Sequence, residues 1–211
     1  RAGNEAGKAA GGVSKLKNAI GGLVSTYAAI QAAKFVFFKT AELETQTRSL
    51  QVLTGSMETA KSVVKELQEF GNVTPFTSTE LIETAKRLKA FGVDTEKLVD
   101  TTKRLGDVAG ATGADLSGIA TAYGQIQAKG RLQGEELLQL QERGINLQDE
   151  LQKMYGMTGD QFRSALEKGK FSAEAVEVAL KNLTSTGGKY ANGAIAQSDT
   201  LSGKLSTLQD G

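Results

Sequence analysis

The residues best able to do chemistry in this 211-residue sequence are two neighbouring carboxylates, Glu135 and Glu136. Carboxylate pairs that flank a glycosidic bond act as acid and base in glycosidases. Here the two lie side by side in a predicted helix, where adjacent side chains point about 100° apart and do not face each other. We therefore interpret them as acidic residues of a first helical turn, which the helix dipole favours. A glycosidase pair is the alternative, although no tryptophan is present to line a sugar cleft.

Most other chemistry is excluded by residue types that are missing. The sequence contains no histidine and no cysteine, so the usual metal ligands, the near-neutral proton shuttle and the thiol nucleophile are absent. The glycines at 110 and 113 lack the Gly-Lys-Ser/Thr ending of a phosphate loop, and no strand precedes them. We interpret them as part of a helix connection. The prediction is no catalytic residue, no cofactor and no metal.

Charge gives no support for a nucleic-acid surface or an anionic membrane, because the net charge is only +1. The basic residues of the predicted helices lie opposite the apolar stripes, so we expect them on solvated faces. This set comprises Lys86, Arg87, Lys89, Lys103 and Arg104.

The elements that carry these residues are predicted to be helices. With 39% hydrophobic and 23% charged residues, the composition is that of a folded globular protein. Proline occurs once, and the 25 glycines fall mostly between segments of helical periodicity. No alternation of period two persists. The predicted fold is all-α, a compact array of short capped helices preceded by a longer apolar N-terminal helix.

Three regions follow from the pattern. Residues 1–40 combine a Gly/Ala-rich arm with an apolar helix, residues 41–186 form the globular helical domain, and residues 187–211 are a loose linker leading into a further helix. Residues 19–38 are apolar enough to suggest a membrane span, but Lys34 interrupts them at a cost of several kcal/mol. We see no cleavable secretory signal. Because the sequence begins without methionine and ends within a helical pattern, we expect it to be a piece of a longer protein.

Helix starts are predicted from capping residues. Ser, Thr and Asp side chains accept hydrogen bonds from the free backbone N–H groups of a first turn. The predicted caps are Ser56, Thr77 with Glu80, Asp94, Asp115 or Ser117, Thr158 with Gln161, and Ser172. Phe76 and Phe91 are predicted as core anchors, since phenylalanine is usually buried.

The stretch from 124 to 144 is predicted to be two helices joined by an elbow. Gly130 ends the first helix, Gly134 starts the second, and Gly144 stops it. Leu132 stands alone among polar residues between them. It either pins the elbow or presents a contact to a neighbouring molecule, and the sequence does not separate the two.

The same stretch resembles the central signature of the tape measure domain found in the tail length tape measure proteins of long-tailed bacteriophages and prophages. The matching positions are Gln125, Gly130, Leu132, Gly134, Glu135, Glu136, Gln139, Leu140 and Gly144. Upstream, Thr74, Pro75, Phe76, Leu88, Phe91, Gly92 and the run from 106 to 118 fit the same pattern. The resemblance covers roughly residues 40–210. One departure is Asn146, where the family pattern has a proline.

The resemblance implies a structural, non-enzymatic domain that serves tail assembly, length determination and DNA ejection. It implies tail tip or baseplate hub proteins, the tail tube protein and tail assembly chaperones as partners, and a homo-oligomer in the tail, without sequence-specific nucleic-acid binding. The implied location is the lumen of the virion tail tube, and the host cytoplasm during assembly. Because residues 41–186 are punctuated by glycines and compact, we expect them to anchor at the tail tip or baseplate and not to measure length. The alternatives are a peptidoglycan hydrolase using Glu135 and Glu136, and a membrane-active ejection component using residues 19–38.

Overall fold

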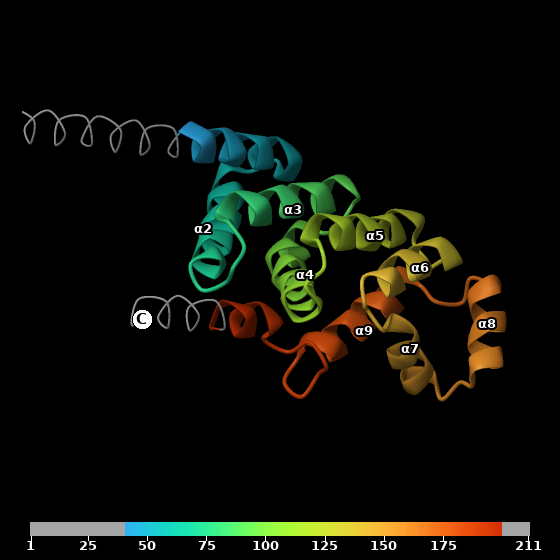
Figure 1. Ribbon diagram of the computed structural model, residues 1–211. Coiled ribbons are helices and arrows are strands. Elements are labelled where there is room, and N and C mark those ends of the chain that lie inside the picture. Colours follow the sequence, from blue (N-terminus) through green and yellow to red (C-terminus); the bar gives the residue numbers. More distant parts are fainter. Residues whose placement is uncertain (1–40, 200–211) are drawn as a thin grey trace, which may run out of the picture. The chain divides into compact units, whose positions relative to one another are not determined.

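The computed structural model describes residues 41–199 of the chain, and this part is all-α, as predicted (Figure 1). Its helices are residues 41–54, α2 (Met57–Gly71), α3 (Ser78–Ala90), the 3₁₀ helix η1 (Thr95–Lys97), α4 (Leu98–Thr112), α5 (Leu116–Lys129), α6 (Gly134–Glu142), α7 (Leu147–Tyr155), α8 (Gly159–Glu167), α9 (Ala173–Thr184) and residues 193–199. The described residues contain no β-strand, and their single β-bridge joins Arg131 to Ser172.

Side-chain caps start five of these helices, because each supplies an acceptor for a backbone N–H that the helix itself cannot satisfy. The predicted caps at Ser56, Thr77, Asp115, Thr158 and Ser172 are confirmed. The pair of Thr158 and Gln161 forms the full reciprocal capping box. At Asp94 the prediction is wrong, since its side chain makes no capping bond and the 3₁₀ helix η1 intervenes before α4.

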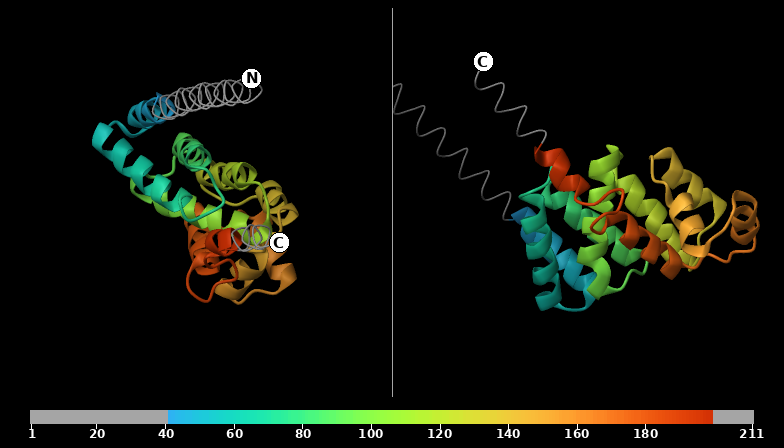
Figure 2. Two further views of the ribbon diagram at one scale, coloured as in Figure 1. Left: turned by 60° about the vertical axis from the view of Figure 1, so that its left-hand side comes forward. Right: turned by 90° about the horizontal axis from the view of Figure 1, so that it is seen from below.

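The helices α2 to α9 belong to the compact unit that begins at Gln46. Helices α2, α3, α4 and α5 pack on one another, while α6 and α8 both contact α7. The two groups are joined by the contact of α5 with α6 and by helix α9, which contacts both α4 and α7 (Figures 1 and 2). The shared core between them includes Leu105, Ile119, Leu140, Leu147 and Val176, all fully or almost fully buried.

Three phenylalanine rings lie close to helix backbones at positions where glycine has no side chain. A Cβ atom on Gly106 would lie 3.1 Å from the ring of Phe70 and 3.8 Å from that of Phe76. On Gly124 it would lie 2.2 Å from the ring of Phe91. Phe76 and Phe91 are half-buried. The prediction that they are fully buried core residues is therefore wrong. Each ring packs against the surface of a helix and keeps part of its own surface exposed.

Two of the basic residues expected on solvated faces also connect helices, Arg87 from an exposed position and Arg104 from a partly buried one. Arg87 of α3 donates to the backbone oxygen of Ser117 at 3.1 Å and to the hydroxyl of Thr121 at 2.9 Å, both on α5. Arg104 of α4 donates to Asp100 at 2.7 Å and to the hydroxyl of Thr184, the last residue of α9, at 2.9 Å. Their charges therefore contribute to the packing of neighbouring helices.

Several predictions fall outside the described residues. These are the N-terminal arm, the apolar helix at 13–38 with its possible membrane contact, and the helical stripe at 201–208. Among residues 41–199, no helix combines the length and apolarity needed to cross a membrane. The domain boundaries stay predictions, but residues 187–194 differ from the loose segment expected, because Tyr190 and Ala194 are 4% and 0% exposed.

Candidate functional site

The elbow between α5 and α6 is the best-defined feature of the signature region. Helix α5 ends at Gly130, whose φ of 70° lies in the left-handed region that glycine adopts without a Cβ clash. The next residues pair with the segment before α9. The N–H of Leu132 donates to the oxygen of Phe171 at 2.8 Å, and the N–H of Ala173 donates to that of Gly130 at 3.0 Å. The elbow is thus fixed by backbone hydrogen bonds to a segment forty residues away.

Leu132 pins this elbow. Its exposed fraction is 0%, so it has no surface to offer a neighbouring molecule, and the first of the two sequence interpretations holds. Beside it, Phe171 is 1% exposed and stacks on Phe162 of α8 with ring centroids 4.8 Å apart. Aromatic pairs at this distance add to the free energy gained from area burial alone. The elbow therefore rests on a packed apolar cluster.

The two carboxylates of the elbow lie in different environments. The side chain of Glu135 is 71% exposed, and its Oε2 atom lies 3.9 Å from Nζ of Lys129. The side chain of Glu136 is 0% exposed, and its Oε1 atom forms an ion pair and a hydrogen bond with Nζ of Lys129, the last residue of α5. Both are acids of the first turn of α6, as interpreted; Glu136 is in addition buried against the end of α5.

This arrangement connects the first turn of α6 to the end of α5 through an ion pair. Glu136 has no exposed surface with which to meet a sugar, and its hydrogen bond to Lys129 raises the pKa of that lysine above its usual range. The ammonium group therefore stays charged near neutral pH. Among the described residues, no group of His, Cys, Asp or Glu could hold a metal ion.

Two acceptor oxygens at the elbow are buried without a hydrogen-bond donor among the described residues. They are Oε2 of Glu136 and Oε1 of Gln125. Gln125 lies one turn before Lys129, so both project from the same face of α5. A buried carboxylate with a single partner costs free energy that its surroundings must offset. The elbow depends on Lys129 for that reason.

The turn from α6 to α7 is held by Tyr190, which lies in the segment after α9 and is not among the predicted site residues. Tyr190 is 4% exposed, and its hydroxyl donates to the oxygen of Gly144 at 3.0 Å. The same hydroxyl accepts from the N–H of Asn146 at 3.0 Å. A proline at position 146 has no N–H and could not make this bond. The one departure from the family pattern is therefore used in this chain to hold the segment after α9.

Replacing Tyr190 by phenylalanine should lower the free energy of unfolding by about 1–2 kcal/mol, because two hydrogen bonds are lost while the ring stays buried. Urea denaturation followed by circular dichroism would measure the change. The matched control is Tyr155→Phe, since Tyr155 is 49% exposed. Equal stability of the two variants would show that the hydroxyl of Tyr190 contributes nothing.

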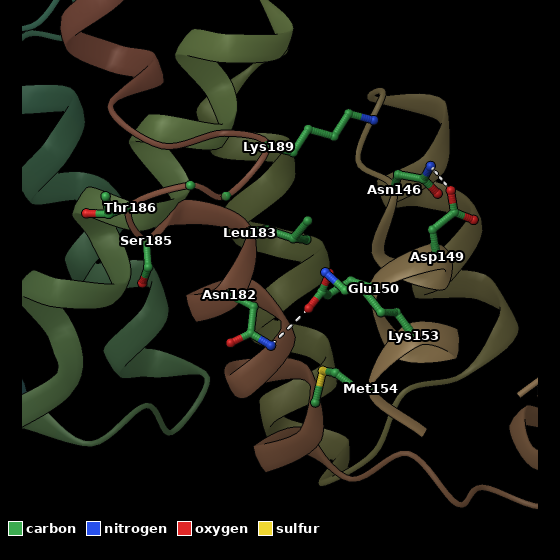
Figure 3. A pocket seen from close by; sticks show the side chains of 12 residues that line it. Asn146, Asp149, Glu150, Lys153, Met154, Asn182, Leu183, Ser185, Thr186 and Lys189 are labelled. Atoms are coloured by element: carbon green, nitrogen blue, oxygen red, sulfur yellow. Dashed lines mark hydrogen bonds between the residues drawn. The ribbon is translucent and has the colours of Figure 1, made fainter. Parts of the chain in front are cut away.

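A polar groove of about 700 Å³ lies between α7 and the segment that follows α9 (Figure 3). Across it, Asn182 donates to Oε1 of Glu150 at 2.9 Å, and Asn146 donates to Asp149 on the α7 side. Lys153 and Lys189 also line it. Both carboxylates are thus engaged by amides. Sequence reasoning missed this groove because its two sides come from segments that only the tertiary fold brings together.

The structure places the signature residues in two groups. Thr74, Pro75 and Phe76 form the turn between α2 and α3, where the hydroxyl of Thr74 donates to the oxygen of Phe70 at 2.9 Å. The second group occupies the elbow and α6. Phe91 and Gly92, which end α3, join the second group, because the ring of Phe91 covers Gly124, the neighbour of Gln125. Gln139 is half-buried and Leu140 is 4% exposed. Their functional roles stay predictions.

These features define an all-helical domain in which Gly130 ends α5, Leu132 is buried in the elbow and Phe91 packs on Gly124 of α5. The chain belongs to the tape measure protein family. The model of that family, described as "Tape measure protein", matches residues 37–211. This confirms the resemblance drawn from the elbow residues.

Curated relatives agree. The chain is 30% identical to the Mu-like prophage FluMu protein gp42 of Haemophilus influenzae over 152 residues, which are 68% of this chain and 23% of that protein. It is 28% identical to the probable tape measure proteins of Lactococcus phages p2 and SK1 over 186 residues, 83% of this chain and 18% of each relative. The chain thus spans about a fifth of the length of these relatives. No solved structure matches it significantly.

Proposed function

We propose that this chain is a structural, non-enzymatic domain of a phage tail tape measure protein, and that it anchors that protein at the tail tip or baseplate. Membership of the family supports the structural role. The single observation behind anchoring is compactness. The longest named helices, such as α4, have 15 residues and span about 22 Å, and they fold back on one another. A ruler needs extended length, which must come from other parts of the full chain.

The proposed partners follow from this place in the tail. They are the tail tip or baseplate hub proteins, the tail tube protein and the assembly chaperones, with further copies of the chain in the tail. The domain acts in the lumen of the tail tube after assembly in the host cytoplasm, and it leaves with the DNA during ejection. The net charge of +1 supports the absence of sequence-specific nucleic-acid binding.

Anchoring is tested by unfolding the domain within the full-length protein of a phage that carries it. Leu140→Asp buries a charge in α6, since Leu140 is 4% exposed, and Leu138→Asp on the same helix does not, since Leu138 is 56% exposed. We expect Leu140→Asp to abolish tails and Leu138→Asp to leave tails of normal length in electron micrographs.

A deletion separates anchoring from measuring. Removing a helical stretch outside this domain should shorten tails, whereas removing the domain should prevent their initiation. If deletion of the domain merely shortened tails in proportion to the residues lost, the anchoring proposal would be wrong.

A further inference from the structure

One part of the signature region has no role in the elbow, namely the face of α4 that carries Gly106, Asp107 and Gly110. Gly106 receives the phenylalanine rings described above. At Gly110 the backbone of α4 lies against the backbone of Ala194, because a Cβ atom on Gly110 would lie 2.6 Å from both N and Cα of Ala194. Contacts that short do not occur for real Cβ atoms, so any larger residue at position 110 must displace this segment or α4.

The approach is as close from the other side. A Cβ atom on Gly193 would lie 2.2 Å from the backbone oxygen of Asp107 and 2.7 Å from Cβ of Ala111. Ala194 is fully buried. Two glycines from opposite sides therefore let two backbones meet. Residues 193–199, which begin at this contact, form the short red helix beside α4 in Figure 1.

Asp107 holds the start of that helix. Its Oδ1 atom accepts a hydrogen bond from the N–H of Ala194 at 3.2 Å, which is the role of a capping residue supplied by another helix. Burial raises the pKa of Asp107 above its usual range, and the hydrogen bond from Ala194 opposes that rise. The contact is thus polar as well as steric.

The glycines before this helix also serve contacts. A Cβ atom on Gly188 would lie 2.3 Å from the oxygen of Asn182 and 2.6 Å from that of Leu183, and the N–H of Tyr190 donates to the oxygen of Leu183 at 2.7 Å. A glycine-rich stretch between helices ordinarily indicates a flexible linker. Here the glycines permit close packing, and Tyr190 fastens the stretch to the α6–α7 turn.

We propose that the face of α4 formed by Asp107, Gly110 and Ala111 is a docking face for the first turn of the helix at 193–199, so that this helix extends from the domain as a rigid junction in a fixed direction. The effect of this docking on tail assembly rests on the proposed function. The remainder of the tape measure chain is then coupled to the anchoring domain without a flexible joint, and the position of the anchor determines where the measured length begins.

Hydrogen–deuterium exchange of the 211-residue chain tests the dock. Gly110→Ala should speed exchange of the amides at 194–199 by about tenfold, because overpacking displaces the helix, while α2, α3 and α5 keep their protection. Alanine has the higher helix propensity, so weakening of α4 itself would not explain the change. Asp107→Ala should speed exchange of the same amides about fivefold. The matched control is Gly134→Ala, where no atom lies within 4 Å.

The outcomes separate this inference from the anchoring proposal. The docking proposal is overturned if, in the unaltered chain, the amides at 194–199 exchange as fast as those of an unfolded peptide. It is also overturned if Gly110→Ala leaves their exchange rates unchanged. Both outcomes are independent of the tail phenotype. In a phage with the full-length protein, Gly110→Ala should broaden the distribution of tail lengths without changing its mean. An unchanged distribution would overturn the rigid coupling.

Discussion

Replacing Lys129 by methionine should lower the melting temperature of the domain by about 5–10 °C. The methionine keeps most of the aliphatic stem but leaves Glu136 as a fully buried carboxylate without its ion-pair partner. The other oxygen of Glu136 already lacks a hydrogen-bond donor among the described residues, so nothing replaces the lost interaction. We place the effect in the lower part of the range for broken buried pairs, because the side chain of Lys129 is 39% exposed.

Two further variants identify the cause of that loss. Lys181→Met removes an exposed lysine from the end of α9 and should change the melting temperature little. Adding Glu136→Gln to Lys129→Met removes the unpaired charge and should restore a large part of the stability, as happens when both partners of a buried pair are replaced. If the double variant melts no higher than Lys129→Met alone, the unpaired carboxylate is not the cause. Calorimetry of the four proteins gives the comparison.

The helices and their caps could be predicted because they depend on residues close in sequence. Ser56, Asp115 and Ser172 each accept a hydrogen bond from the N–H three residues ahead, so the signal lies within one helical turn. The same locality explains the correct end of α5 at Gly130. Local rules thus predicted the fold class and the starts of α2, α3, α5, α8 and α9.

The elbow could be predicted in outline but not in its energetics. The helical pattern located Glu136 in a first turn, yet its burial depends on how α6 returns against α5, which no local pattern reports. Likewise the sequence shows Leu132 isolated among polar residues, but it does not show that Leu132 pairs with Phe171, which lies about forty residues later. Single-sequence patterns indicate which residues are apolar, and tertiary pairing decides which of them are covered.

The segment after α9 was misread for a related reason. Glycine permits flexible backbone and also permits close approach of two backbones, and the sequence alone does not distinguish these uses. At Gly188 and Gly193 the neighbouring atoms would lie within 2.3 Å of an added Cβ, so close approach is the use here. Buried Tyr190, flanked by these glycines, was the one available signal against a loose linker.

Replacing Leu132 by alanine should lower the free energy of unfolding by about 2–5 kcal/mol, the range found when a buried leucine is truncated. Leu132 is fully buried, and the segment around it is only a few residues long with a left-handed glycine on one side. That segment is held by a hydrogen bond from Leu132 to Phe171 and by one from Ala173 to Gly130, so it cannot move inward to fill the space. The upper half of the range is therefore the expected result.

The matched control is Leu138→Ala, six residues later, where the leucine is 56% exposed; its effect should stay within about 0.5 kcal/mol. Denaturant unfolding measures both, and exchange of the Leu132 amide reports whether its bond to Phe171 persists. If Leu132→Ala costs no more than Leu138→Ala, the leucine does not pin the elbow and the hydrogen bonds alone hold α6 in place. If the stability falls and that amide exchanges freely, the apolar contact is what keeps the two segments paired.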